Sequence, residues 1–203
     1  MYKAIIFDVD GTLLNTENAV LHSLQSVLAE EGLDYELDEL RFVLGITGKA
    51  AIEQLNILDE ETILEKWLAR EASMIEEVEV FEGVHEILAA IPESGVVTSK
   101  NADEMASGFY PFEIDHHFDA IVCASDTDEH KPHPAPLLKS LEVLGRSPEE
   151  VIYIGDSPYD MACAHAAGAD FGLALWGAGS TDGFEQAEHV FEHPTDILKL
   201  IAR

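Results

Sequence analysis

The chain has 203 residues, of which 47% are hydrophobic and 25% charged, so it is long enough to bury a substantial core. Its 11 lysines and arginines face 40 aspartates and glutamates, which gives a formal net charge of −29. This charge argues against binding to the phosphate backbone of nucleic acids or to an anionic membrane surface. The simplest interpretation of the acidic excess is solubility, and the alternative is a high-salt habitat, which unfolding at low ionic strength would support.

Two cysteines, Cys123 and Cys163, lie among apolar or small residues, without the spacing of metal ligands. We expect both to be buried free thiols, as in a reducing compartment. The chain enters an apolar segment directly after its first residues and has no apolar run long enough to span a bilayer. These features predict a cytoplasmic protein.

The first predicted element is a strand that ends at Phe7, directly before Asp8 and Asp10. A short apolar run without alternation is typical of a parallel strand that is covered on both faces. Asp10 lies in a turn with Gly11, so both carboxylates can face one crevice at the C-terminal end of the strand. One carboxylate can then act as a nucleophile while the other transfers a proton.

Residues 16–80 are predicted to be all-helical. Apolar residues recur at helical spacing before Gly32, and further helices are expected at 38–44, 49–55 and 59–75. The segment contains no convincing strand and is too long for a loop. We therefore predict an inserted helical domain, residues 16–80, between the two parts of a core domain, residues 1–15 and 81–203.

From residue 81 onward, strand and helix signals alternate. Such repeated βα units predict an α/β fold with a Rossmann-like parallel sheet and right-handed crossovers. The expected strands are 95–98, 120–123, 151–154 and 171–175, and the expected helices are 84–91, 102–109, 134–144, 158–167 and 197–201.

Polar residues follow several of these strands. Thr98 ends the second core strand, where its hydroxyl and the adjacent backbone N–H groups can hold a phosphoryl oxygen. Lys131 lies in a proline-rich loop and can neutralise a phosphoryl group and a carboxylate together. Asp156 and Asp160 follow the strand at 151–154 and offer the oxygen ligands that Mg²⁺ prefers. Each residue also has a structural alternative: a helix cap for Thr98 and Asp156, and a solvated loop lysine for Lys131.

Four segments occur in one order: Asp-Val-Asp-Gly-Thr from Asp8, Thr-Ser-Lys from Thr98, Lys-Pro-His-Pro from Lys131 and Gly-Asp-Ser-Pro-Tyr-Asp before and through Asp160. They resemble motifs I to IV of the haloacid dehalogenase-like (HAD) phosphohydrolase superfamily. The helical segment lies between motifs I and II, which is the cap position of the subfamily that resembles phosphoglycolate phosphatase and β-phosphoglucomutase. The resemblance implies the HAD fold with an all-helical cap.

The resemblance also implies a route through an aspartyl-phosphate intermediate. Asp8 would attack phosphorus, and Asp10 would protonate the leaving oxygen and then deprotonate the hydrolytic water. Thr98 and Lys131 would offset charge on the phosphoryl oxygens. The carboxylic acid at Asp10 indicates a phosphate-ester enzyme, because dehalogenases and phosphonoacetaldehyde hydrolases of this superfamily have no acid at that position.

The implied cofactor is Mg²⁺, held by Asp8, the backbone carbonyl of Asp10, Asp156 and, directly or through water, Asp160. Substrate-binding candidates come from motif I, from the segment after Thr98 and from a glycine-punctuated turn between two cap helices. They are Gly11, Ser99, Lys100, Asn101, Thr47 and Lys49.

The leading functional prediction is an enzyme, a Mg²⁺-dependent phosphatase that hydrolyses a small phosphate monoester, as phosphoglycolate phosphatase does. Its expected partner is a small phosphorylated metabolite, such as phosphoglycolate, a sugar phosphate, a nucleotide or pyrophosphate, and neither a nucleic acid nor a membrane. Two alternatives remain: a sugar phosphomutase similar to β-phosphoglucomutase, and a catalytically idle binding protein on a HAD scaffold.

Overall fold

A computed structural model describes residues 2–201 and contains a six-stranded parallel sheet. The strand order is β5-β4-β1-β6-β7-β8, so β1 lies inside the sheet, with Ile6 between Gly95 of β4 and Tyr153 of β6. The expected parallel α/β sheet is confirmed. The strands are β1 (Ala4–Phe7), β4 (Ser94–Val97), β5 (Ala120–Val122), β6 (Val151–Gly155), β7 (Asp170–Ala174) and β8 (His189–Phe191).

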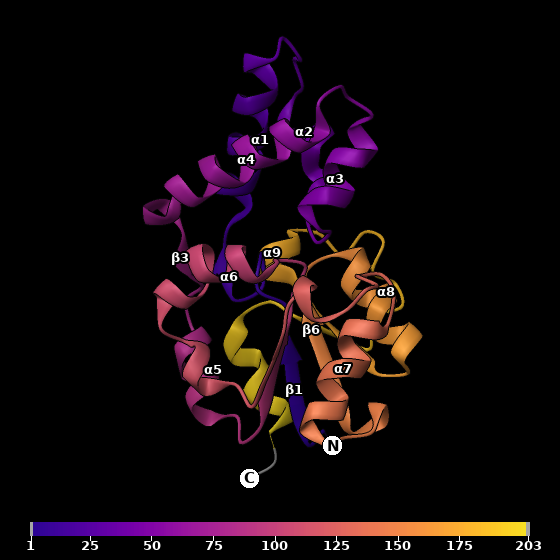
Figure 1. Cartoon of the computed structure of the whole chain (residues 1–203). Coiled ribbons are helices and arrows are strands. Elements are labelled where there is room, and N and C mark those ends of the chain that lie inside the picture. The colour runs from indigo at the N-terminus through magenta and orange to yellow at the C-terminus, as the bar shows by residue number, and fades with distance from the viewer. Residues whose placement is uncertain (1, 202–203) are drawn as a thin grey trace.

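Helices cover both faces of this sheet (Figure 1). Ile5 and Phe7 of β1 pack with α5 (Val84–Ala90), α6 (Ala102–Gly108) and the C-terminal 3₁₀ helix η7 (Pro194–Leu200). Ala4 and Ile6 point to the other face and pack with α7 (Ala135–Leu144) and α8 (Pro158–Ala167). Because successive strand residues face opposite ways, an all-apolar strand serves both layers.

Four helices form a separate unit beyond the C-terminal edge of the sheet (Figure 1). They share one apolar cluster, in which the Trp67 indole N–H donates to the Val20 carbonyl at 3.2 Å and lies 3.1 Å from Ser23 Oγ. This cluster gives the unit a core of its own. The helices are α1 (Glu17–Glu30), α2 (Leu37–Leu40), α3 (Gly48–Leu55) and α4 (Glu60–Ser73).

The prediction that residues 16–80 contain no strand is wrong. The chain leaves the sheet through β2 (Leu14–Asn15) and returns through β3 (Glu79–Val80), and these two strands pair antiparallel. Each spans two residues, which is too short for a period-two pattern to be visible in the sequence. The pair holds the two connecting segments side by side at the base of the helical unit.

Three further elements differ from the sequence-based expectations. The expected helix at 38–44 divides into α2 and a 3₁₀ turn, η1 (Arg41–Val43), and the closing helix is the 3₁₀ helix η7. The edge strand β8 was not predicted, because three residues flanked by polar ones carry little pattern. The remaining elements are α9 (Leu175–Ala178) and the 3₁₀ turns η2 (Ile75–Glu77), η3 (Tyr110–Phe112), η4 (Asp115–His117), η5 (Ala124–Asp126) and η6 (Pro148–Glu150).

Both cysteines are free and buried, as expected. Burial raises the pKa of the Cys163 thiol to about 12, so this thiol stays protonated at neutral pH and is a poor nucleophile. Among residues 2–201, no helix combines the length and the hydropathy that crossing a lipid bilayer requires.

Candidate active site

Three parallel strands end at one place and bring the predicted catalytic side chains together. Asp8 directly follows β1, Thr98 follows β4, and Asp156 follows β6. In Figure 1, β1 and β6 end beneath the helical unit, at the edge where open α/β sheets bind their ligands. Lys131 reaches the same edge from the loop that follows β5.

Lys131 is the cation at the centre of this site. Its Nζ lies 2.9 Å from Asp8 Oδ1, 2.7 Å from Asp160 Oδ1 and 3.3 Å from the Tyr153 hydroxyl. The lysine and both carboxylates are buried. Burial lowers the pKa of Lys131, but the charges of Asp160 and Asp8 raise it by more, so the ammonium stays charged.

Asp160 holds Lys131 in place. Its Oδ2 accepts hydrogen bonds from the Ser157 amide at 3.0 Å and from the Ser157 hydroxyl at 2.6 Å, in a capping box at the start of α8. Its Oδ1 accepts from Lys131, and the Tyr153 hydroxyl lies 3.0 Å away. Both oxygens are thus occupied, so direct coordination of a metal by Asp160 would displace one of these donors.

A third carboxylate, that of Asp156, lies close to the two that contact Lys131. Oxygens of Asp8, Asp156 and Asp160 all lie within 4.8 Å of one another. Burial raises the pKa of Asp8 to about 7, with Asp160 adding to the shift and Lys131 opposing it, and burial raises the pKa of Asp156 as well. Asp8 Oδ1 is buried and accepts no well-directed hydrogen bond. Hard oxygen donors with surplus buried negative charge fit Mg²⁺.

Gly11 allows Asp156 to approach the first motif. Its φ is +73°, and a Cβ at this position would overlap the Asp156 carboxylate. Thr12 Oγ1 donates to Asp156 Oδ1 at 3.1 Å. Sequence analysis missed a second close approach. Gly177 in α9 lies so near the Gly11 carbonyl that a Cβ at position 177 would overlap it. No local pattern in the sequence marks this close approach.

The segment after β4 gives its candidates different roles. The Lys100 amide donates to Thr98 Oγ1 at 3.2 Å, which leaves the threonine hydroxyl proton free for another acceptor. Lys100 Nζ lies 3.2 Å from Asp10 Oδ1, next to the site. The Asn101 side chain caps α6 by accepting from the amides of Asp103 and Glu104.

A match to a known protein family shows where this chain belongs. The family model described as haloacid dehalogenase-like hydrolase matches residues 5–174. The chain belongs to this family. Its HAD fold and its predicted membership of this family are thereby confirmed, and so is the prediction that it is a hydrolase.

Individual HAD relatives support the same conclusion. A pyrophosphatase PpaX from Bacillus cereus is 30% identical over 186 residues, which cover 86% of this chain and 83% of that protein. A Clostridium perfringens protein provisionally named pyrophosphatase PpaX is 34% identical over 213 residues, covering 100% and 99%. The solved structure of a provisionally named phosphoglycolate phosphatase from Lactobacillus plantarum has a TM-score of 0.91 at 30% identity, covering 99% of this chain and all of that one.

In this HAD hydrolase the helical unit contacts the edge that carries the predicted catalytic residues. Ser99 Oγ donates to the Gly45 carbonyl at 2.8 Å, and the Tyr159 hydroxyl lies 3.5 Å from the Phe42 carbonyl. Gly45 has a φ of +90°, and a Cβ there would overlap Ser157. The turn after η1 therefore rests on both the second and the fourth HAD motif.

The two candidates on the helical unit lie farther out. Thr47 caps α3 by accepting from the Ala50 amide at 3.3 Å, and Lys49 is 80% exposed, with Glu53 at 3.9 Å. Both line an outer cleft together with Ser99 and Asn101, whereas Asp8 and Asp10 line an inner pocket. The structure does not bring Thr47 or Lys49 into that inner pocket.

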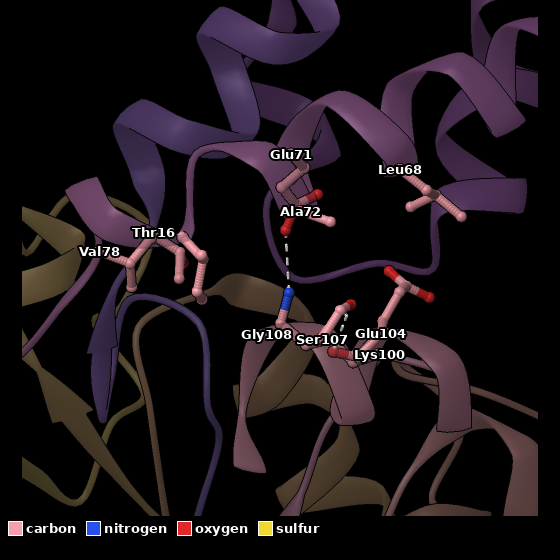
Figure 2. Close-up of a pocket in the computed structure, with 10 residues that line it drawn as sticks. Thr16, Leu68, Glu71, Ala72, Val78, Lys100, Glu104, Ser107 and Gly108 are labelled. Atoms are coloured by element: carbon pink, nitrogen blue, oxygen red, sulfur yellow. Dashed lines mark hydrogen bonds and ion pairs between the residues drawn. The ribbon is translucent and has the colours of Figure 1, made fainter. Parts of the chain in front are cut away.

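Sequence analysis missed a residue that does reach the inner pocket from the helical unit. Glu71 lies in the last turn of α4, and its Oε1 is 3.0 Å from Lys100 Nζ. Figure 2 shows Glu71 above and Lys100 below, joined by this contact. In the sequence, Glu71 is one more acid on a helix with an acidic outer face, so no signal distinguished it.

Proposed function

We propose that this HAD hydrolase is a Mg²⁺-dependent phosphatase that cleaves a small phosphate monoester through an aspartyl-phosphate on Asp8. One observation carries the proposal: the buried Asp8 carboxylate lies 2.9 Å from the Lys131 ammonium, beside two further carboxylates and two residues before Asp10. A carboxylate that faces a fixed cation and a cation site can accept a phosphoryl group whose negative charge it would otherwise repel.

The carboxylates of Asp8 and Asp156 and the backbone carbonyl of Asp10 would hold Mg²⁺, with Asp160 contributing through water. The bound ion would neutralise charge on the phosphoryl oxygens. Asp160 keeps its own role in this arrangement, because its oxygens position Lys131. Asp8 and Asp156 would therefore face the metal, whereas Asp160 orients Lys131.

The protein's own groups divide the reaction into two displacements. In the first, an Asp8 oxygen forms a bond to phosphorus, the bond to the leaving oxygen breaks, and Asp10 gives that oxygen a proton. In the second, Asp10 takes a proton from water, whose oxygen bonds to phosphorus and releases Asp8. Lys131 and the Thr98 hydroxyl stabilise the phosphoryl oxygens in both steps.

We propose that residues 16–80 act as a cap domain on a core of residues 1–15 and 81–203. The contact of Ser99 with Gly45 supports this, because it closes the helical unit over the pocket that contains Asp8. Closure excludes water and limits the size of the substrate. A small phosphorylated metabolite is therefore the proposed partner.

The proposal predicts release of inorganic phosphate from a panel of small phosphoesters, and loss of that activity on chelation of Mg²⁺. Phosphoglycolate belongs to the panel, and the anhydride pyrophosphate is assayed beside it, because the relatives' names refer to them. Substituting Asp156→Asn should abolish the rise in melting temperature that Mg²⁺ gives the wild type. Inactivity on the whole panel with Mg²⁺ would contradict the proposal, and transfer between sugar phosphates without phosphate release would identify a mutase.

Asp10→Asn tests the proposed acid. The variant should lose about 10²–10⁴-fold in rate on alkyl phosphates, whose leaving oxygen needs a proton. It should lose far less on p-nitrophenyl phosphate, because that leaving group departs as a stable anion. Steady-state rates on both substrates measure the difference. Equal losses on the two would remove Asp10 from the protonation step.

A further inference from the structure

The pocket beside Asp8 and Asp10 is the space that a leaving group must enter. Asp10, its proposed proton donor, lines this pocket. Apart from Glu71, the described side chains that line it from the helical unit are apolar, and Lys100 is the one cationic group among the described lining residues. The apolar lining residues are Val20, Val43, Leu44, Ile46, Trp67 and Leu68.

The charge of Lys100 is already matched within the protein. Its Nζ lies between Asp10 Oδ1 at 3.2 Å and Glu71 Oε1 at 3.0 Å, and its side chain is 6% exposed. Burial lowers the pKa of Lys100, but Asp10 and Glu71 raise it by more, so the ammonium stays charged at neutral pH. Glu71 remains its counter-ion when Asp10 carries the proton that it donates. Figure 2 shows the contact that joins α4 to the segment after β4.

A third acid, Glu104, faces the same pocket without a cation of its own. Its Oε2 accepts from the Asn101 amide at 3.0 Å, and the side chain also lines the cavity behind Lys100 (Figure 2). Burial raises its pKa to about 7, against the Asn101 hydrogen bond and Lys100, with Glu71 and Asp10 adding to the shift. Glu104 therefore offers no cation to a charged leaving group, and it adds negative charge to the pocket whenever it is ionised.

We infer that this pocket selects phosphate esters with uncharged leaving groups, and that Glu71 is the residue that sets this specificity by neutralising Lys100. The inference rests on the proposed phosphatase activity. A leaving group with its own carboxylate or phosphate would have to displace Glu71 from Lys100 or lie unpaired beside Glu71 and Glu104. Both arrangements cost free energy in a pocket withdrawn from water.

Two esters of matched size test the inference. Phosphoglycolate and 2-hydroxyethyl phosphate differ only in a carboxylate against a CH₂OH group. The wild type should favour 2-hydroxyethyl phosphate by about tenfold or more in kcat/KM. Glu71→Gln keeps the shape of the side chain but frees the charge of Lys100, so it should shift the ratio toward phosphoglycolate by about tenfold. The control Glu65→Gln, at an exposed acid of the same helix, should leave the ratio unchanged.

A binding measurement separates this inference from the proposed function. Turnover of p-nitrophenyl phosphate with Mg²⁺ tests whether the protein is a phosphatase at all. Calorimetry on Asp8→Asn, with and without Glu71→Gln, gives the dissociation constants of both esters even where no turnover occurs. A wild-type preference for phosphoglycolate, or a ratio of dissociation constants that Glu71→Gln leaves unchanged, would overturn the inference.

Discussion

Asp8→Asn should reduce the turnover of every phosphoester by about 10⁴-fold or more, because the amide cannot form the covalent intermediate. The substitution keeps the size of the side chain, so Lys131 and Asp160 retain their contact at 2.7 Å. Steady-state rates with Mg²⁺ measure the loss, and phosphate bound covalently to the wild type but not to the variant would be seen by mass spectrometry after an acid quench.

The same substitution should stabilise the metal-free protein near neutral pH. Burial raises the pKa of Asp8 from its usual value of 3.8 to about 7 in the folded state. The unfolded chain thus releases this proton at a lower pH than the folded chain, so stability falls as the pH rises from about 4 to about 7. The Asp8→Asn substitution removes this fall, and the advantage of the variant in urea unfolding should vanish toward about pH 4.

One control variant serves both the turnover and the unfolding measurement, and a different result would contradict each prediction. Asp34→Asn changes an exposed acid of the helical unit and should leave the turnover rate unchanged. Its free energy of unfolding should stay within about 0.5 kcal/mol of the wild-type value. An active Asp8→Asn variant would exclude Asp8 as the nucleophile. A metal-free variant that is less stable than the wild type near neutral pH would show that Asp8 is held as a favourable ion pair instead.

The site residues that directly follow predicted strands could be identified from the sequence. Asp8, Thr98 and Asp156 each follow an apolar strand, and parallel strands bring their C-terminal ends to one edge. Lys131 could be added from its order in the chain and its proline-rich loop. The fold followed in the same way, because long βα repeats leave few topologies open.

The role of Glu71 could not be predicted in this way. It depends on where α4 lies over α6, and nothing in the local pattern of either helix records that placement. The different roles of Asp156, which would face the metal, and Asp160, which positions Lys131, also depend on hydrogen bonds that the sequence does not show. One signal was present, since Ser157 and Asp160 have the spacing of a capping box, which would have indicated that Asp160 is engaged by its own helix.

Lys131→Met should destabilise the protein by about 3–5 kcal/mol near neutral pH, because it leaves the buried carboxylates of Asp8 and Asp160 without their cation. Turnover should fall by about 10²–10³-fold or more, since a donor to the phosphoryl oxygens is lost. Urea unfolding and steady-state rates measure the two effects. Lys139→Met, at a half-exposed lysine of α7, should change neither.

A double-mutant cycle decides whether Lys131 acts through Asp8. In Lys131→Met the carboxylate of Asp8 remains buried and unpaired, whereas Asp8→Asn removes that charge. Asp8→Asn should therefore stabilise Lys131→Met by more than it stabilises the wild type, with a coupling free energy of about 1–3 kcal/mol. Strictly additive effects of the two substitutions would mean that Lys131 stabilises the fold through Asp160 alone, and that its contact with the proposed nucleophile contributes nothing to folding.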